Sequence, residues 1–416
     1  MQDPSFRGPD PAEVRSRLLH WYDRCRRDLP WRRTRDPYAI LVSEIMLQQT
    51  RVETALPYYR RFLERFPTVE RLAAATEAEV LRAWQGLGYY GRARYLWRAA
   101  RAIVQRHGGR VPAEREALLA LPGIGEYTAG AVLSIAFDQP VAAVDGNAER
   151  VLARLFGIDE DLSRASGRRA IRERAARLVA GPRPGDVNQA VMELGATVCT
   201  PREPACGTCP VAPLCAAQAA GRQHELPVRS RRAAVREQHF AVAWCLVDGR
   251  LALVRRPSRG LLAGLWALPY VERAPAEPWP EASRRLASAL ARVLGRPVRV
   301  DGCVARTRWE FSHRRWHLRV YAARPGGADG GEGAVPSPPA FPVAGTAGVV
   351  PAGVVAEGPG DWTAAEAGTE MRWVALERLG ELPMSSLDRQ IIGLLAGGGP
   401  ADEGAEEAEE GREGGR

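Results

Sequence analysis

The sequence predicts two domains of different class, an N-terminal all-α domain followed by a C-terminal α+β domain. The length of 416 residues exceeds that of one ordinary domain and allows about two cores. Residues 12–198 read as successive helices separated by turns, with no convincing strand ladder. From residue 238 onward, apolar runs rich in β-branched residues replace the helical periodicity.

The first informative helix is predicted from AILVSEIMLQQT, residues 39–50, a nearly continuous apolar run that contains one carboxylate, Glu44. Asp36 and Pro37 precede it in the manner of an N-cap and a first-turn proline. Glu44 would then lie among apolar side chains three and four residues away. Burying a carboxylate is costly unless it is protonated or hydrogen-bonded. Glu44 is therefore either a satisfied core carboxylate or a functional acid.

A second pair of helices is predicted from ALLALPGIGEYTAGAVLSIAF, where a Pro-Gly-x-Gly turn precedes a helix that begins near Glu126. Glycines let a backbone approach a ligand closely, and the free N–H groups of a helix N-terminus favour phosphate. This pattern is typical of a helix–hairpin–helix that grips the DNA backbone without reading sequence; an ordinary helix–helix turn is the alternative. Twenty residues beyond Gly125, Asp145 is placed to cap a helix that starts near Asn147.

A cysteine cluster closes the helical region. Four cysteines follow one another at spacings of six, two and five residues: Cys199, Cys206, Cys209 and Cys215. Four thiolates can surround one metal centre, and a reducing compartment disfavours disulfides, which leaves zinc or an iron–sulfur cluster. The spacing does not choose between them. With all four positions occupied by protein, the centre would be a structural clasp.

The C-terminal domain begins with two apolar runs on either side of Asp248-Gly249, a hairpin signal. Further strands are predicted within 297–324, a helix over 280–295, and a strand followed by a helix within 370–396. We therefore predict a helical domain over 1–220, a basic linker over 221–237 and an α+β domain over 238–396. Its Gly/Ala/Pro-rich insertion, 325–369, and the acidic tail, 397–416, are predicted to be disordered.

The charge of the chain suggests a polyanionic partner. The net charge is +9, and the last sixteen residues carry −5, so residues 1–400 carry +14. Nucleic acid is favoured over a membrane surface, because no apolar stretch approaches the ~20 residues of a membrane span and no signal peptide is recognisable. We expect a soluble, cytoplasmic protein.

All 58 basic residues are arginine, and the sequence contains no lysine. Codon bias and a hot habitat both produce such a composition. Without a side-chain amine, Schiff-base lyase chemistry of the lysine type is excluded.

The order of these motifs closely resembles the endonuclease III superfamily of DNA glycosylases and, within it, the adenine DNA glycosylases of the MutY family. The resemblance rests on SEIMLQQTRVET, GLGYYGRAR, LPGIGEYTAGA, VDGN, NQAVMELGATVCT and the cysteine spacing, and covers about residues 12–220, more loosely the remainder. It implies two helical subdomains, a 4Fe-4S cluster, and a monomer acting at the nucleoid on double-stranded DNA that contains A opposite 8-oxoguanine or G.

The resemblance also assigns chemical roles. Glu44 would stay protonated through burial and give its proton to adenine N7, while Asp145, ionised near a helix N-terminus, would face the cationic sugar or attack it. Tyr127 and Asn147 would position Asp145 and the sugar. Tyr127 stands where bifunctional relatives carry lysine, so the resemblance implies a monofunctional enzyme.

The remaining assignments concern DNA. By resemblance, Gln49 and Tyr89 wedge into the base stack, Arg32 and Gln189 lie near the adenine pocket, and Thr50 and Leu87 contact 8-oxoguanine. The hairpin residues would hold the DNA backbone: Leu121, Pro122, Gly123, Ile124 and Gly125.

The C-terminal domain resembles the Nudix-fold module that these enzymes use to recognise 8-oxoguanine, with Ser312 and His313 as the polar probes. A β-turn with ordinary surface residues is the alternative there. The helix PEASRRLASALARVLG lacks the Arg-Glu-x-x-Glu-Glu pattern that holds magnesium in Nudix hydrolases. We therefore expect this domain to bind and not to hydrolyse.

Three alternatives remain open. An endonuclease III-like glycosylase for oxidised pyrimidines is opposed by the absent lysine. A nucleotide hydrolase is opposed by the missing metal-binding helix. A non-catalytic DNA-binding scaffold is opposed only by the pair of Glu44 and Asp145.

Overall fold

The computed structural model describes residues 8–230, 235–257, 260–311, 314–326 and 370–397. The chain divides into two compact units, Met1–Thr76 with Arg94–Ala233 and Glu77–Ala93 with Ala234–Arg416. This division groups residues 77–93 with the C-terminal unit, whereas the domain boundary predicted from the sequence keeps them in the helical domain. The predicted insertion and tail lie almost wholly outside the described residues, as do Ser312 and His313.

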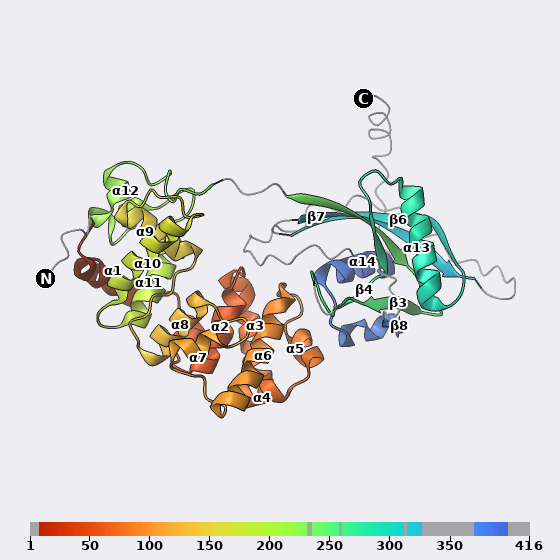
Figure 1. Cartoon of the computed structure of the whole chain (residues 1–416), viewed down its shortest axis with the longest axis horizontal. Coiled ribbons are helices and arrows are strands. Elements are labelled where there is room, and N and C mark those ends of the chain that lie inside the picture. Colours follow the sequence, from red (N-terminus) through yellow and green to blue (C-terminus); the bar gives the residue numbers. More distant parts are fainter. Residues whose placement is uncertain (1–7, 231–234, 258–259, 312–313, 327–369, 398–416) are drawn as a thin grey trace, which may run out of the picture. The chain divides into compact units, whose positions relative to one another are not determined.

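Residues 8–230 contain helices and no strand, as predicted (Figure 1). The helices are α1 (Pro11–Cys25), α2 (Pro37–Leu47), α3 (Val52–Arg65), α4 (Val69–Ala74), α5 (Glu77–Ala83), α6 (Tyr90–His107), α7 (Arg115–Leu119), α8 (Glu126–Phe137), α9 (Gly146–Phe156), α10 (Ala165–Val179), α11 (Pro184–Thr197) and α12 (Ala216–Ala219). One apolar core joins α1, α9, α10 and α11, and three of the four clustered cysteines pack against it.

The C-terminal unit contains two sheets. Sheet A has the order β5-β1-β7-β6, and β3 in sheet B pairs with β2, β4 and β8. The strands are β1 (Arg236–Trp244), β2 (Leu246–Val247), β3 (Arg250–Arg255), β4 (Trp266–Ala267), β5 (Tyr270–Arg273), β6 (Val298–Glu310), β7 (Arg314–Pro325) and β8 (Met371–Ala375). Among the described residues after 234, the α-helices are α13 (Trp279–Leu294) and α14 (Ser386–Ala396), and the segment 77–93 adds α5 and the start of α6 to this unit.

Both faces of sheet A contribute residues to an apolar core. On one face, Ala241, Ala243 and Tyr321 pack with Leu286 of α13. On the other, Phe240, Trp316 and Leu318 share a core with sheet B and α14. Because alternate residues of a strand point to opposite faces, neighbouring residues of β1 and β7 belong to different cores.

The predicted hairpin at Asp248-Gly249 is present but shorter than the apolar runs indicate. Both turn residues have positive φ, 48° and 70°, as a two-residue primed turn requires. It joins β2 to β3, whereas β1 ends at Trp244 and pairs with β5 and β7. The first apolar run therefore contributes to both sheets, because its residues up to Trp244 find longer partners in sheet A.

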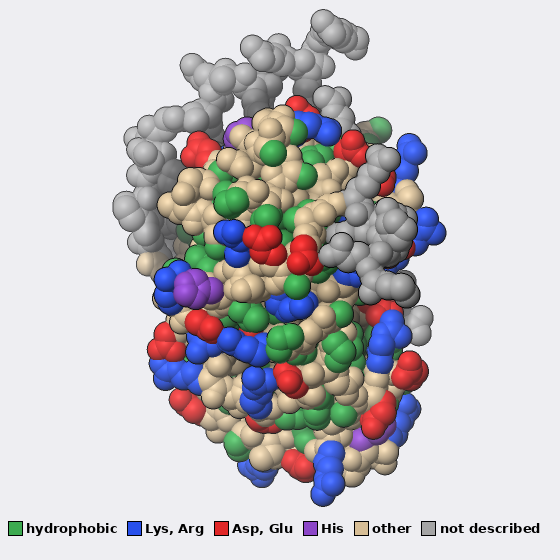
Figure 2. All heavy atoms as spheres, turned by 90° about the vertical axis from the view of Figure 1, so that its left-hand side faces the viewer, with side chains coloured by type: hydrophobic (Ala, Val, Ile, Leu, Met, Phe, Trp, Pro, Cys, Tyr) green, Lys and Arg blue, Asp and Glu red, His purple; other side chains and the backbone are tan. Residues whose placement is uncertain are grey.

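The charge on one side of the molecule is mixed. Figure 2 shows arginine side chains spread among acidic ones on the face it views, with no single basic patch there. Among the described residues, no helix is long and apolar enough to cross a membrane.

Candidate active site

Glu44 is buried in α2, as the sequence predicts. Asp36 caps the helix by accepting hydrogen bonds from the N–H groups of Tyr38 (3.0 Å) and Ala39 (3.4 Å), and Pro37 occupies its first turn. Nine consecutive residues, 38–46, are buried, and Glu44 itself is only 6% exposed. The helix thus carries the carboxyl group into an apolar interior.

Burial raises the pKa of Glu44 to about 7. The hydroxyl of Tyr127 donates a hydrogen bond to Oε2 at 2.5 Å, which lowers the pKa of Glu44. The negative charge of Asp145 raises this pKa, and the guanidinium of Arg32 lowers it. A carboxyl group with such a pKa is protonated in a large fraction of molecules near neutral pH, as a general acid must be.

Asp145 caps α9, as predicted. Its carboxylate accepts hydrogen bonds from the Ala148 N–H (2.7 Å) and from the side-chain amide of Asn147 (3.1 Å). These bonds favour the ionised form, but burial has the larger effect and raises the pKa of Asp145 above its ordinary value. The direction is opposite to that expected from the helix N-terminus alone, because the sequence does not reveal how much water the surrounding helices exclude.

Tyr127, on α8, contacts side chains of both α2 and α11. Besides its bond to Glu44, its hydroxyl lies 3.5 Å from the sulfur of Met192 on α11. Burial and the neighbouring carboxylates raise the pKa of Tyr127 well above its ordinary value, so it remains a hydrogen-bond donor. The structure therefore bonds Tyr127 to Glu44 and Asn147 to Asp145, whereas the sequence analysis assigned both Tyr127 and Asn147 to positioning Asp145.

An ion-pair cluster beside Glu44 was not predicted. Glu193 of α11, 1% exposed, binds Arg27 (2.8 Å) and Arg32 (2.7 Å). The hydrogen bonds and charges of these two arginines outweigh burial and lower the pKa of Glu193 to about 2. Gln189 lies one helical turn before Glu193 on the same face of α11. Glu193 stands within NQAVMELGATVCT, but no local signal distinguishes it from a surface glutamate.

The loop before Asp145 is also held by a residue that the sequence did not single out. Asn188 of α11 accepts a hydrogen bond from the N–H of Ala143 (3.0 Å) and donates to the carbonyl of Val141 (2.9 Å). Glycine allows the close packing around this loop, because a Cβ on Gly130 would lie 2.3 Å from the carbonyl oxygen of Ala142. Contacts with α8 and α11 therefore fix the loop that leads to Asp145.

Two of the residues predicted to contact DNA, Gln49 and Tyr89, have an unusual backbone conformation. Gln49 (φ 58°) and Tyr89 (φ 48°) both adopt the left-handed conformation, which is uncommon for residues other than glycine and concentrates at functional sites. The side-chain oxygen of Gln49 is buried without a hydrogen-bond partner among the described residues. Thr50 is half-buried directly after Gln49, and Leu87 is buried near Tyr89 in the sequence.

The predicted hairpin, Leu121–Gly125, connects α7 to α8. Leu121 and Ile124 are buried, while Gly123 and Gly125 are exposed. Gly123 has φ 77°, and a Cβ there would lie 2.4 Å from the Cβ of Tyr95, so only glycine fits. The N-cap of α8, Gly125, has no side chain to occupy the first N–H groups of the helix, which leaves them available to a phosphate.

The four predicted metal ligands are free thiols on one loop. Burial raises the pKa of Cys209 to about 11, and the charges of the other three cysteines add to this increase. The four thiols therefore lie close enough together to influence one another. Arg154, 2% exposed, donates to the sulfur of Cys199 at 3.4 Å and to the carbonyls of Thr200 and Leu226. Within the described residues, no three His, Cys, Asp or Glu side chains converge tightly enough for a single metal ion.

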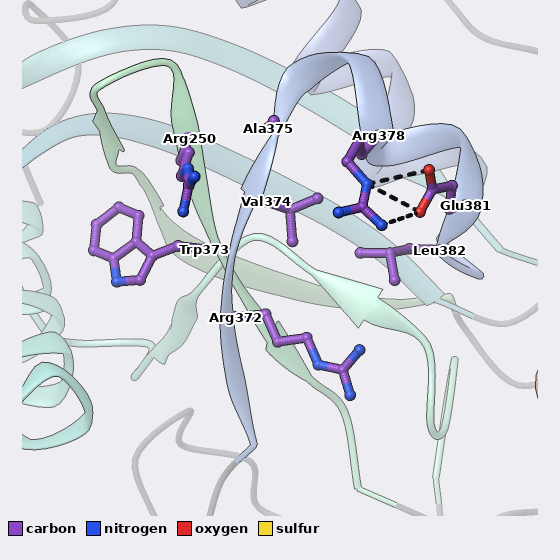
Figure 3. Close-up of a pocket in the computed structure, with 8 residues that line it drawn as sticks. All are labelled: Arg250, Arg372, Trp373, Val374, Ala375, Arg378, Glu381 and Leu382. Atoms are coloured by element: carbon purple, nitrogen blue, oxygen red, sulfur yellow. Dashed lines mark hydrogen bonds and ion pairs between the residues drawn. The ribbon is translucent and has the colours of Figure 1, made fainter.

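A separate pocket of about 250 Å³ lies on the C-terminal unit (Figure 3). Arg250, Arg372 and Trp373 line it from β3 and β8, and Arg378 forms an ion pair with Glu381 at its edge (2.8 Å). It contains none of the residues predicted for catalysis, and its arginines lie far along the chain from Glu44.

Comparisons with known proteins agree with the two-domain fold. Residues 42–179 match the HhH-GPD superfamily of base excision DNA repair proteins, and residues 241–394 match the NUDIX domain. The chain is 42% identical over 320 residues to the adenine DNA glycosylase of Rattus norvegicus, covering 64% of this chain and 62% of that protein. With the adenine DNA glycosylase of Schizosaccharomyces pombe it is 36% identical over 337 residues, covering 67% and 73%.

Among solved structures, a thermostable thymine-DNA glycosylase is 34% identical and covers 51% of this chain and 97% of its own, with a TM-score of 0.46. The helical fold and the family match over residues 42–179 identify a base excision DNA repair protein of the helix–hairpin–helix class. Within that class, the chain belongs to the adenine DNA glycosylase family, the MutY family. It spans about 62% of the length of the rat protein.

Proposed function

We propose that this protein is a monofunctional DNA glycosylase that removes adenine paired with 8-oxoguanine or guanine. The observation that carries the proposal is Glu44, a buried carboxyl group whose pKa is about 7, within reach of the charge of Asp145. A carboxyl pair of this kind suits the cleavage of a glycosidic bond, where one group protonates the leaving group and the other faces the cationic sugar.

In the proposed reaction, adenine leaves the duplex and enters the site. Glu44 gives its proton to adenine N7 and the bond between N9 and C1′ breaks, so that adenine leaves as a neutral base. Water then adds to C1′ and passes one proton to the Glu44 carboxylate, which yields the abasic sugar and regenerates the acid. Asp145, held by Asn147 and by the N–H of Ala148, stabilises the positive charge that develops at C1′. Tyr127 orients the carboxyl group of Glu44.

The absence of lysine supports hydrolysis without strand cleavage. The residue that contacts Glu44 from α8 is a tyrosine, and a phenol cannot form a Schiff base with the abasic sugar. The oxidised-pyrimidine glycosylase with lyase activity is therefore disfavoured. A non-catalytic DNA-binding scaffold would have no role for a Glu44 carboxyl group whose pKa is raised.

We further propose that Cys199, Cys206, Cys209 and Cys215 hold a 4Fe-4S cluster. Four neighbouring thiols suit such a cluster, and a single zinc ion would require four ligands at about 2.0–2.3 Å from one point. The cluster would have a structural role and would hold residues 199–215 beside α9. Metal analysis that returned about one zinc and no iron per chain would overturn this assignment; the expected protein is yellow-brown with broad absorption near 400 nm.

The C-terminal unit is proposed to select the partner base through Ser312 and His313 without hydrolysing nucleotides. Helix α13 has the sequence WPEASRRLASALARVL, in which Glu281 is the only acid, so it lacks the carboxylates that magnesium would need. We propose that the protein works as a monomer on duplex DNA.

The decisive experiment is release of adenine from a duplex with one A opposite 8-oxoguanine, with and without subsequent alkali. We expect free adenine, and strand cleavage only after alkali. Cleavage without alkali would indicate a lyase, and binding without any base release would indicate a scaffold.

A further inference from the structure

One face of sheet A carries a row of basic side chains. The strand registers place Arg273 of β5 beside His239 of β1, His239 beside His317 of β7, and His317 beside Arg308 of β6. Cross-strand partners point to the same face, so these four residues form one row across all four strands. The imidazole rings of His239 and His317 stack at 4.7 Å.

A second row adjoins the first. Two residues along β7, Arg319 lies directly opposite Arg306 of β6. Like charges opposite one another destabilise a sheet, and neither of these arginines pairs with a carboxylate among the described residues. We call the six residues Arg273, His239, His317, Arg308, Arg319 and Arg306 the basic face.

Helix α13 covers one end of this side of sheet A and leaves the basic face beyond it. Trp279, at the start of α13, marks the boundary: its ring contacts His239 and lies under the guanidinium groups of Arg273 (4.8 Å) and Arg319 (4.3 Å). Figure 1 shows β6 and β7 extending past α13. Arg306 and Arg308 are exposed, and the other members of the basic face are half-buried.

The nearby acids only partly offset this charge. Glu237 binds His317 and Arg315 (both 2.6 Å), and Glu310 binds Arg315 at 2.9 Å and lies 3.9 Å from Arg308. Even with Arg315 and both glutamates included and the histidines neutral, the region has a net charge of +3. Arg319 is hydrogen-bonded to the hydroxyl of Tyr321 and stacked on Trp279, but it and Arg306 face each other without a carboxylate partner among the described residues. An anion bound between them would relieve the repulsion.

We propose that the basic face binds the phosphodiester backbone of duplex DNA, in addition to the contacts made by the helical unit. Three strand spacings of about 4.8 Å make the row about 14 Å long, over which one DNA strand carries about four phosphates. Arginine forms bidentate bonds with phosphate oxygens, and two adjacent rows provide a band of donors of matching length. The inference rests on the proposed function in that it takes duplex DNA as the substrate.

The test measures the affinity of the full chain for duplex DNA as a function of salt. The test variant is Arg306→Gln with Arg308→Gln, because both side chains are exposed and their removal leaves the core intact. The matched control is Arg284→Gln with Arg292→Gln, which removes the same charge from the exposed side of α13. A third variant, Arg306→Lys with Arg308→Lys, keeps the charge.

If the basic face binds the backbone, the glutamine variant loses roughly tenfold or more in affinity at about 0.1 M salt, and the slope of log K against log salt decreases by about 2. The loss is equal for duplexes with A:8-oxoguanine, A:G and A:T pairs. The lysine variant keeps most of the slope, and the control keeps the parent's slope and affinity.

Two results would overturn the inference: a slope in the glutamine variant equal to that of the control, or a loss confined to the duplex with 8-oxoguanine, which would indicate lesion reading. Binding by the parent is measured independently of adenine release. A parent that binds with the expected slopes but releases no adenine would therefore refute the proposed function alone. Thermal unfolding of each variant verifies that the fold is intact.

Discussion

The proposed catalytic carboxyl groups of the helical unit and the exposed arginines of sheet A in the C-terminal unit differ in how they contact water. In the helical unit, Glu44 is buried and Asp145 half-buried, and loss of water raises the pKa of both. In the C-terminal unit, Arg306 and Arg308 project from sheet A into solvent. Burial changes which protonation state a group prefers, whereas exposure preserves its charge for attraction to an anion. The first unit is thereby suited to proton transfer, and the second to contact with a polyanion.

Buried carboxyl groups also differ between the units. Asp388 in α14 is 3% exposed, but it accepts hydrogen bonds from the N–H of Leu268 (3.0 Å) and from the hydroxyl of Ser385. Glu44 has one donor, Tyr127, and an acidic neighbour, Asp145. Asp388 has two hydrogen-bond donors, whereas Glu44 has one donor and an acidic neighbour. Replacing each carboxyl group by its amide should therefore have different effects.

The largest expected effect is that of Glu44→Gln. The amide keeps the shape of the side chain but has no acidic proton, so single-turnover release of adenine should decrease by a hundredfold or more while DNA affinity is retained. Asp388→Asn is the matched control: it should lower the melting temperature but leave release within a few-fold below that temperature. Near-normal release by Glu44→Gln would show that Glu44 is a core residue like Asp388.

Asp145→Asn should reduce release by about a hundredfold. Asparagine is also a good N-cap, so α9 remains capped and the loss reflects the missing negative charge at the sugar. Single-turnover kinetics and circular dichroism on the same sample would separate the two effects. A melted helix with proportionate loss of activity would reduce Asp145 to a structural cap.

Replacing Ser312 and His313 with alanine should weaken the preference for 8-oxoguanine over guanine. Each polar contact to a base edge is worth about 1–3 kcal/mol, or roughly 5- to 150-fold in preference. Paired single-turnover assays on the two duplexes measure the change, and release opposite guanine should change far less. An equal loss on both duplexes would mean that these two residues only support the fold, and an unchanged preference would assign lesion reading to other residues.

The smallest expected effect is that of pH on the parent enzyme. The pKa of Glu44 is raised, so the active protonated form is present below about pH 7 and lost above it. Between pH 7 and 8 the protonated fraction decreases from about one half to about one tenth, and the single-turnover rate should decrease about fivefold. DNA affinity, which depends on arginines, should change little over this interval. A rate that rises with pH would assign the dependence to another group.

Local signals in the sequence were sufficient for much of the helical unit. Asp36 and Pro37 predict the start of α2, and Asp145 predicts the start of α9, because a cap depends on a few neighbouring residues. The left-handed backbones of Gln49 and Tyr89 were not predicted, since neither residue type requires that conformation. The ion pairs of Glu193 were missed because its partners, Arg27 and Arg32, lie more than 160 residues away.

The amino-acid sequence by itself determined the class of both domains, the order of the helices, the cysteine set and the absence of a lysine nucleophile, because these depend on composition and on short-range patterns. Three properties were decided only by the tertiary structure. Strand β1 pairs within sheet A and not within the hairpin, the pKa of Asp145 is raised, and Arg306 lies opposite Arg319. Those properties depend on which distant segments exclude water from a group or place two charges side by side. Desolvation and cross-strand register are set by the packed chain, and no local pattern contains them.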